Sequence, residues 1–348
     1  MNARRTRRAL AGAVLLVVPM TAASCSNPLD QPDRQVSAGE VVPALGNPDG
    51  QLISVETPAG RLDFLVGTAR PDETPYSSDD SPGSPESLGA SDGNTLVGVS
   101  YSLAIGTGWA AMLDADRPVT PVVQLVVDPG QESEHAYDLS DIVIDEADSA
   151  GYPTTLGVSG SAWVAVPGDG SDLAIAVDYD GLRQVKEVDD LDQSEGAAAM
   201  LYSRRSELGT SYIDCGAPAT RGQVLDDLNG QCLVQVSKTP YVPGLGWVSS
   251  RDRAWLVVES TVRPDEPTAD GGRVRVGCSG TGEMGPVTYR FEGAKPEDVE
   301  QVGPDTETHG RDRVVWETDS LARGELTLRA DFARDACVVP LTWSLQVY

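Results

Sequence analysis

The apolar residues of this chain fall into short runs separated by turn-forming residues, and this pattern restricts the fold more than any other feature. The 348 residues include 36 glycines and 24 prolines but only 3 phenylalanines, and valine, threonine and serine are plentiful. Long stretches with helical periodicity are scarce. Branched residues favour extended backbone, whereas glycine and proline form turns and end strands. The sequence therefore predicts an all-β protein with many turns.

The length of the chain suggests two domains rather than one. We predict a first β-sandwich domain over residues 51–187, a linker over 188–200 and a second β-sandwich domain over 201–348. Within the first domain, residues 70–93 are polar and rich in serine, proline and acidic residues. Such a composition buries little apolar surface, so we expect a disordered or loosely held loop there.

Three sequence blocks of the first half resemble three blocks of the second half in the same order. The first pair shares Leu-Val-x-Val-Ser followed by Gly-x-Gly-Trp, and the other two pairs share alternating strand patterns. We interpret them as a tandem duplication of one domain, with chance similarity of valine-rich strands as the alternative. The paired blocks are residues 94–110 with 231–248, QLVVD from Gln124 with WLVVE from Trp255, and GSDLAIAVDY from Gly170 with GELTLRADF from Gly324.

The N-terminus has the layout of a secretory signal. Four arginines within the first eight residues are followed by an apolar run over Ala9–Met20, then by small residues and Cys25. The apolar run is shorter than the roughly 20 residues that span a bilayer. We therefore expect residues 1–24 to direct export by the general secretory or the twin-arginine route.

A cysteine at the end of such a signal resembles the lipobox of bacterial lipoproteins, although Ala22 stands where that motif usually has leucine or valine. The resemblance implies that the thiol of Cys25 carries a diacylglyceryl group, that acyl chains such as palmitate hold the protein at the cell membrane, and that the chain lies outside the cytoplasm. An ordinary cleaved signal and an uncleaved anchor are the alternatives. Residues 25–50 are rich in Pro, Gly and Asp, so we expect a flexible tether there.

The charge of the chain excludes some partners. Its formal net charge is −27, and removal of residues 1–24, which hold four arginines and no acid, makes it −31, because 26 − 4 basic residues then face 53 acidic ones. Such a surface repels nucleic acid. Contact with anionic lipid should therefore depend on the acyl chains. Solubility is the simplest role of the acidic residues, with a cationic partner or calcium as alternatives.

Four cysteines remain after Cys25, and an even number in an exported chain indicates two disulfides. Three pairings exist, of which we favour Cys215–Cys232 and Cys278–Cys337. Free thiols or a zinc site are the alternatives. The chain has no Cys-x-x-Cys motif and only 2 histidines, so no metal site is expected.

The segment SAWVAVPGDGSDLAIAVDYDG (residues 161–181) is similar to the closing hairpin of immunoglobulin-like domains in surface lipoproteins of Gram-positive bacteria. Their family is described as one of unknown function, grouped with immunoprotective extracellular antigens. The resemblance covers about 120 residues of the first domain and, more faintly, the second, which lacks Val-Pro at Glu317-Thr318. It implies two tandem immunoglobulin-like β-sandwiches on the cell surface and little about activity.

No motif in the sequence predicts catalysis or a cofactor. Residues 280–285 match Gly-x-Gly-x-x-Gly, but Pro286 and a strand-like segment follow where a dinucleotide site needs a helix. His135 and His309 are the only histidines, and no Gly-x-Ser-x-Gly elbow is present. No EF-hand loop occurs, which leaves calcium between loops as the one metal alternative. We therefore expect no enzyme.

Two tryptophans, Trp109 and Trp247, occupy matching places in the first pair of blocks. We interpret them as core or turn anchors, with an exposed aromatic platform for a glycan or a protein as the alternative. The sequence as a whole favours a non-catalytic binding or structural module of the cell envelope, whose protein or envelope ligand is not indicated. An accessory or sensing subunit of a membrane complex is the second interpretation, and a hydrolase is the third.

Overall fold

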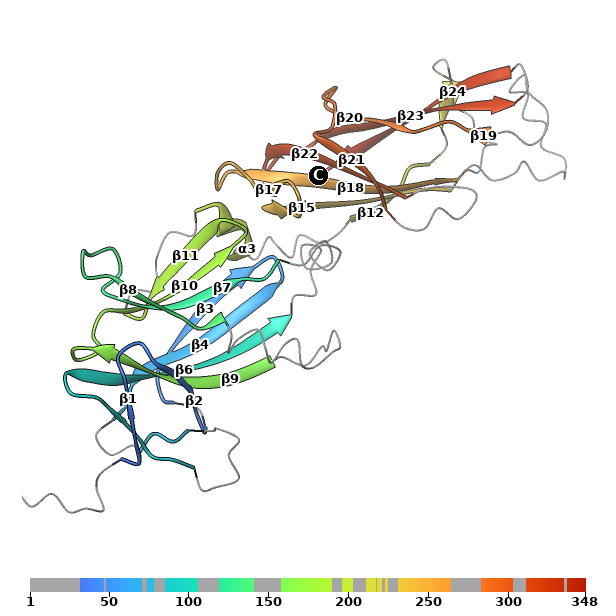
Figure 1. The fold of residues 1–348 in the computed structure, drawn as a ribbon. Coiled ribbons are helices and arrows are strands. Elements are labelled where there is room, and N and C mark those ends of the chain that lie inside the picture. Colours follow the sequence, from blue (N-terminus) through green and yellow to red (C-terminus); the bar gives the residue numbers. More distant parts are fainter. Residues whose placement is uncertain are drawn as a thin grey trace, which may run out of the picture.

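The structure, a computed structural model, consists of β-strands with one 3-10 turn and one short helix among the residues that it describes (Figure 1). This confirms the all-β prediction. The described residues are 32–46, 48–70, 74–77, 85–105, 119–140, 158–189, 196–202, 211–216, 218–220, 223–224, 231–263, 283–302, 311–334 and 337–348.

The first half forms a five-stranded sheet in the order β2-β9-β6-β4-β3 and a four-stranded sheet in the order β11-β10-β7-β8. Alternate side chains of the two sheets meet in one core, in which Phe64 and Val99 from one sheet join Leu125 and Ile175 from the other. The strands are β2 (Val41–Pro43), β3 (Gln51–Thr57), β4 (Gly60–Thr68), β6 (Asn94–Ile105), β7 (Val122–Val127), β8 (His135–Asp138), β9 (Val158–Pro167), β10 (Leu173–Tyr179) and β11 (Leu182–Glu187).

The segment that resembles a closing hairpin does not form a hairpin. β9 lies in the five-stranded sheet and β10 in the four-stranded one, so the turn over residues 168–172 crosses between sheets. Both strands supply buried side chains from their inner faces, including Val164 and Val166 from β9 and Val177 from β10. The hairpin is instead made by β10 and β11, which pair antiparallel.

Part of the expected tether belongs to the first half of the fold. β1 (Arg34–Val36) pairs in parallel with β5 (Leu88–Ala90), and β2 pairs antiparallel with β9. Val36 and Val42 are fully buried and pack with Leu88 against Trp163, on the outer face of the five-stranded sheet. Two valines and a leucine in an otherwise polar stretch therefore hold residues 34–44 and 88–90 on the sheet, where a flexible tether and a loosely held loop were predicted.

The second half also has two sheets. One has the order β12-β15-β18-β22-β21, and the other has the order β14-β13-β24-β23-β19, with β20 also paired to β23. The strands are β12 (Ser211–Asp214), β13 (Ala219–Thr220), β14 (Gln223–Val224), β15 (Gln231–Thr239), β18 (Arg253–Arg263), β19 (Glu283–Met284), β20 (Thr288–Phe291), β21 (Asp298–Val302), β22 (Arg311–Asp319), β23 (Gly324–Arg334) and β24 (Cys337–Val347).

The second half contains a disulfide in its core and a polar cluster around Tyr289. Cys215 and Cys232 form the predicted disulfide, with their Cα atoms 5.3 Å apart, and both belong to the core. Elsewhere in the second half, the hydroxyl of the buried Tyr289 donates to Asp312 Oδ2 at 2.6 Å and lies 2.6 Å from Ser260 Oγ. Burial, followed by the bond to Asp312, raises the pKa of Tyr289 and keeps it neutral.

The two halves share one pattern of strand pairing. Six strands of each half correspond when they are taken in chain order. In one sheet the first of the six pairs with the second and the second with the fourth. In the other sheet the third pairs with the fifth and the fifth with the sixth. This pattern matches β4, β6, β7, β9, β10 and β11 with β15, β18, β20, β22, β23 and β24, respectively.

The structural match corrects the sequence alignment for two of its three blocks. The first block aligned β6 with β15 and the second aligned β7 with β18, each one strand away from its counterpart. The third block aligned β10 with β23, in agreement with the pairing. Valine-rich alternating strands resemble one another whichever place they take in a sheet, so similarity alone could not number them.

Candidate functional site

Three aromatic side chains join the two halves and form the main candidate site. Tyr179 stands at the end of β10, and Tyr241 and Trp247 belong to a small hairpin of β16 (Tyr241–Val242) and β17 (Gly246–Trp247). The ring of Tyr179 meets that of Tyr241 edge-on at 5.4 Å between centroids, and the Tyr241 and Trp247 rings are 5.2 Å apart. The indole Nε1 of Trp247 donates to the carbonyl oxygen of Tyr179 at 2.8 Å. We call this set the aromatic junction.

The sequence explains why the two partners of the junction project from their sheets. β10 and β11 are joined by Asp180-Gly181, both with left-handed backbone (φ of 48° and 79°), the conformation that a tight two-residue hairpin needs. The β16–β17 hairpin turns at Pro243-Gly244-Leu245, and Gly244 again has positive φ (88°). These two turns present Tyr179 and the hairpin to each other.

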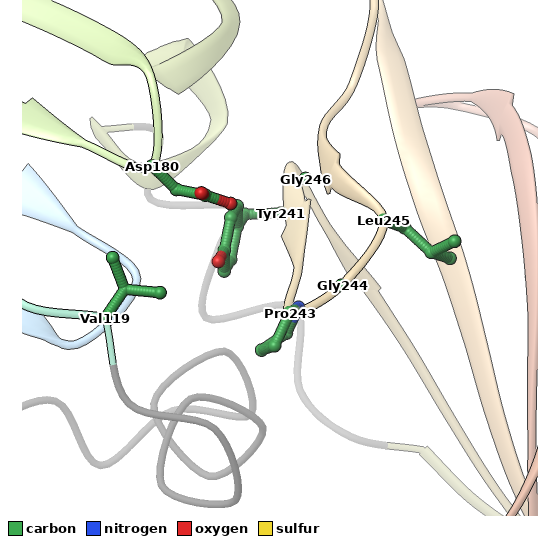
Figure 2. Close-up of a pocket in the computed structure, with 7 residues that line it drawn as sticks. All are labelled: Val119, Asp180, Tyr241, Pro243, Gly244, Leu245 and Gly246. Carbon is green, nitrogen blue, oxygen red and sulfur yellow. The ribbon is translucent and has the colours of Figure 1, made fainter.

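An open hollow of about 540 Å³ lies beside the aromatic junction. Figure 2 shows Asp180 next to Tyr241 on one side and the hairpin residues from Pro243 to Gly246 on the other, with Val119 at the edge. The hollow has one carboxylate and little enclosure by apolar side chains. Such a lining does not define a site for a small molecule.

The hairpin is fixed to the second half by apolar packing and by a polar network. Val242 and Val248 pack against Val257 and Val315 on the outer face of the sheet, and Trp255 Nε1 donates to the Gly246 carbonyl at 2.9 Å.

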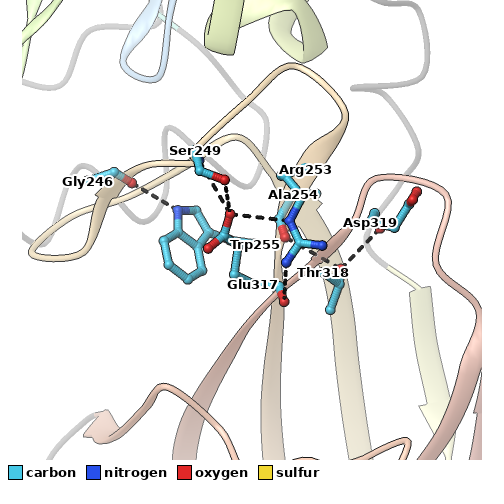
Figure 3. A network of polar contacts seen from close by, with 8 residues as sticks. All are labelled: Gly246, Ser249, Arg253, Ala254, Trp255, Glu317, Thr318 and Asp319. Carbon is cyan, nitrogen blue, oxygen red and sulfur yellow. Dashed lines mark hydrogen bonds and ion pairs between the residues drawn. The ribbon is translucent and has the colours of Figure 1, made fainter.

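Figure 3 shows the polar network next to this packing. Glu317 Oε1 accepts from Ser249 Oγ at 2.7 Å and lies 3.3 Å from Arg253 Nε. The bond from Ser249, with that from Arg253, lowers the pKa of Glu317. The carboxylate thus ties the end of the hairpin to β18 and β22.

A second contact between the halves comes from the end of the predicted linker and the first residues of the predicted second domain. Residues 196–202 form a 3-10 turn, η1 (Gly196–Ala198), and a short helix, α3 (Ala199–Tyr202). Ala197 packs against the cluster beneath the hairpin. The hydroxyl of Tyr202 donates to Gln184 Oε1 at 2.8 Å and accepts from the backbone N–H of Glu56 at 3.0 Å. Residues 196–202 therefore contact both halves.

The predicted site residues fall into three groups. Trp247 lies in the aromatic junction, where its indole is engaged within the chain, in keeping with an anchoring role. Cys215 and Cys232 form the disulfide, and Cys337 begins β24. Cys25, Trp109, Cys278 and His309 lie outside the described residues.

The described residues bring together no set of groups with an obvious chemistry. His135 is exposed on β8. Within the described ranges no three His, Cys, Asp or Glu side chains are placed to hold a metal ion. None of the helices in that part of the chain has the length and apolarity that a membrane span needs.

Sequence reasoning missed the partners of Trp247. Tyr179 and Tyr241 each lay in an aligned block, but no pattern linked them. The Asp-Gly turn after Tyr179 is the one sequence signal that could have placed it at a hairpin tip.

Comparison with known proteins found no matching family, no curated protein and no solved structure that resembles this chain.

Proposed function

We propose that this chain is a lipid-anchored extracytoplasmic protein in which two immunoglobulin-like domains form one rigid, non-catalytic binding or structural module of the cell envelope. The signal layout and Cys25 support the location. The aromatic junction is the observation that carries the rest, because it joins the two halves by ring contacts and by a hydrogen bond of 2.8 Å.

The strand order supports the immunoglobulin-like assignment. Immunoglobulin constant-type domains have strands A, B, E and D in one sheet and C, F and G in the other. The second half has β15-β18-β22-β21 in one sheet and β20-β23-β24 in the other, which follows that order. The first half has the same neighbours, with β4-β6-β9 in the places of A-B-E and β7-β10-β11 in those of C-F-G, and β8 is added beside β7.

The Cys25→Ala variant tests the anchoring. We expect the wild-type protein in the membrane fraction, with a mature N-terminus at a diacylated Cys25 by mass spectrometry, and the variant released into the soluble extracytoplasmic fraction. Ser26→Ala is the matched control, since it changes the neighbouring residue and keeps the thiol. A variant that remains fully membrane-bound, or a wild-type protein that retains residues 1–24, would contradict the proposal.

A further inference from the structure

A pocket on the second half gathers three cationic side chains in a strongly acidic protein. Arg290 on β20, Arg329 on β23 and Lys295, in the turn that leads to β21, line a cavity of about 380 Å³. We call it the basic pocket. The pocket lies between β20, at the edge of one sheet, and residues 295–296, which lead into β21 at the edge of the other sheet.

The register of the strands explains why the two arginines share one face. Thr288 is opposite Arg329 and Arg290 is opposite Thr327 in the antiparallel pair of β20 and β23. The residues between them, such as Tyr289 and Leu328, point into the core. The arginines therefore occupy diagonal positions on the outer face, a placement within reach for long side chains.

The cations of the basic pocket have no carboxylate as an ion-pair partner among the described residues. Its lining contains no acidic residue. Other arginines of the second half have such partners, since Arg313 Nη2 lies 3.0 Å from Glu259 Oε1 and Arg253 Nε lies 3.3 Å from Glu317 Oε1. Within the described residues no ion pair joins Arg290, Arg329 or Lys295 to a carboxylate. A bound anion would supply the negative charge that the lining lacks.

The donors of the pocket suit a tetrahedral oxyanion. Guanidinium groups bind phosphate oxygens in a forked, charge-assisted geometry, and an ammonium group adds a compact charge. Arg290 Nη1 donates to the Gly293 carbonyl at 2.7 Å and the Thr288 hydroxyl donates to the Arg329 carbonyl at 3.2 Å, so the other guanidinium N–H groups, Lys295 and the Thr327 hydroxyl are the donors left for an anion, and Val299 adds an apolar wall. Three cations match the charge of a phosphate ester better than that of a single carboxylate, and the volume leaves room for the group that it esterifies.

We propose that the basic pocket binds a phosphate ester. The net charge of −27 repels free phosphate at long range, but at about 0.15 M salt charges beyond roughly 8 Å are largely screened while direct contacts persist. The local cations then determine binding. This proposal does not depend on the anchoring of the chain.

Calorimetric titration of the full-length protein with glycerol 3-phosphate and with glycerophosphoglycerol, at 0.15 M salt, tests the proposal. The first probe is a monoester like those of soluble ligands, and the second is a diester like those of lipid headgroups and envelope polymers. We expect saturable binding of at least one probe, and the tighter of the two indicates the source of the natural ligand. We expect Arg329→Gln and Lys295→Gln each to weaken binding at least fivefold.

The controls separate binding from folding. Neither substituted side chain has a hydrogen bond within the described residues, so both variants should keep the wild-type unfolding midpoint. Arg251→Gln removes an equal charge from an exposed turn of the second half, outside the pocket lining, and should leave affinity unchanged. Absence of saturable binding by either probe, or equal weakening by Arg251→Gln, would show that the cations only shield the sheet edge from pairing with another chain.

Discussion

At the scale of single residues, Glu317 carries much of the attachment of the hairpin that bears Trp247. Its Oε1 accepts from both the hydroxyl and the backbone N–H of Ser249 and also contacts Arg253. These contacts lower the pKa of Glu317 in the folded state from 4.5. A carboxyl with a lowered folded pKa adds stability above its unfolded pKa and loses it as the pH falls through the folded value.

We therefore expect Glu317→Gln to lower the free energy of unfolding at pH 7 by up to about 1 kcal/mol, as for partly exposed ion pairs. The difference from the wild type should shrink as the pH falls from 7 to 3, because the carboxyl of the unfolded chain takes up its proton first and that of the folded protein follows. Urea unfolding at the two pH values measures it. Glu325→Gln, at an exposed position, is the control. An equal difference at pH 7 and pH 3 would rule out this role of the charge.

At the scale of elements, the N-terminal strands are part of the fold because of a few apolar side chains. Val42 on β2 is 1% exposed and packs beside Trp163. We expect Val42→Ala to lower the free energy of unfolding by about 1–2 kcal/mol through lost burial and a cavity. Leu45→Ala, at a side chain that is 55% exposed, should change it little. If both variants unfold like the wild type in urea, β2 does not contribute to the stability of the sheet.

The hairpin β16–β17 gives a second element-scale prediction. Trp247→Phe keeps an aromatic ring but removes the N–H that the Tyr179 carbonyl accepts. A hydrogen bond of this kind contributes about 1 kcal/mol, so we expect amide protection in residues 241–248 to fall about fivefold. Hydrogen exchange measures it, with Leu245→Ala at the exposed tip as control. Unchanged protection in Trp247→Phe would mean that the bond does not hold the hairpin.

The strands themselves could largely be predicted from the sequence. The segments QLISVET and RLDFLVGT form β3 and β4 with the turn at Pro58-Ala59 between them, because alternation and turn residues are local signals. The burial of Val36 could not be predicted, since it depends on a sheet face supplied by residues more than 120 positions later, such as Trp163. A few apolar residues in a polar stretch do not indicate which distant residues they will pack against.

At the scale of the whole molecule, the sequence predicted two halves but not how they meet. The aligned blocks gave Trp109 and Trp247 matching places but indicated no contact for either, and the structure shows Trp247 in contact with Tyr179 and Tyr241. Contacts between halves depend on which turns project toward each other, and strand periodicity does not record this. The favoured pairing of Cys215 with Cys232 is confirmed.

Ring contacts and one indole hydrogen bond join the two stacked-sheet units, and we propose that they make a single rigid body. Backbone ¹⁵N relaxation of the wild-type protein tests it most directly. We predict one common rotational correlation time for amides of the first half, such as those of β6, and of the second half, such as those of β18. Two distinct correlation times, each shorter than the time expected for one rigid body of 348 residues, would show that the halves move independently.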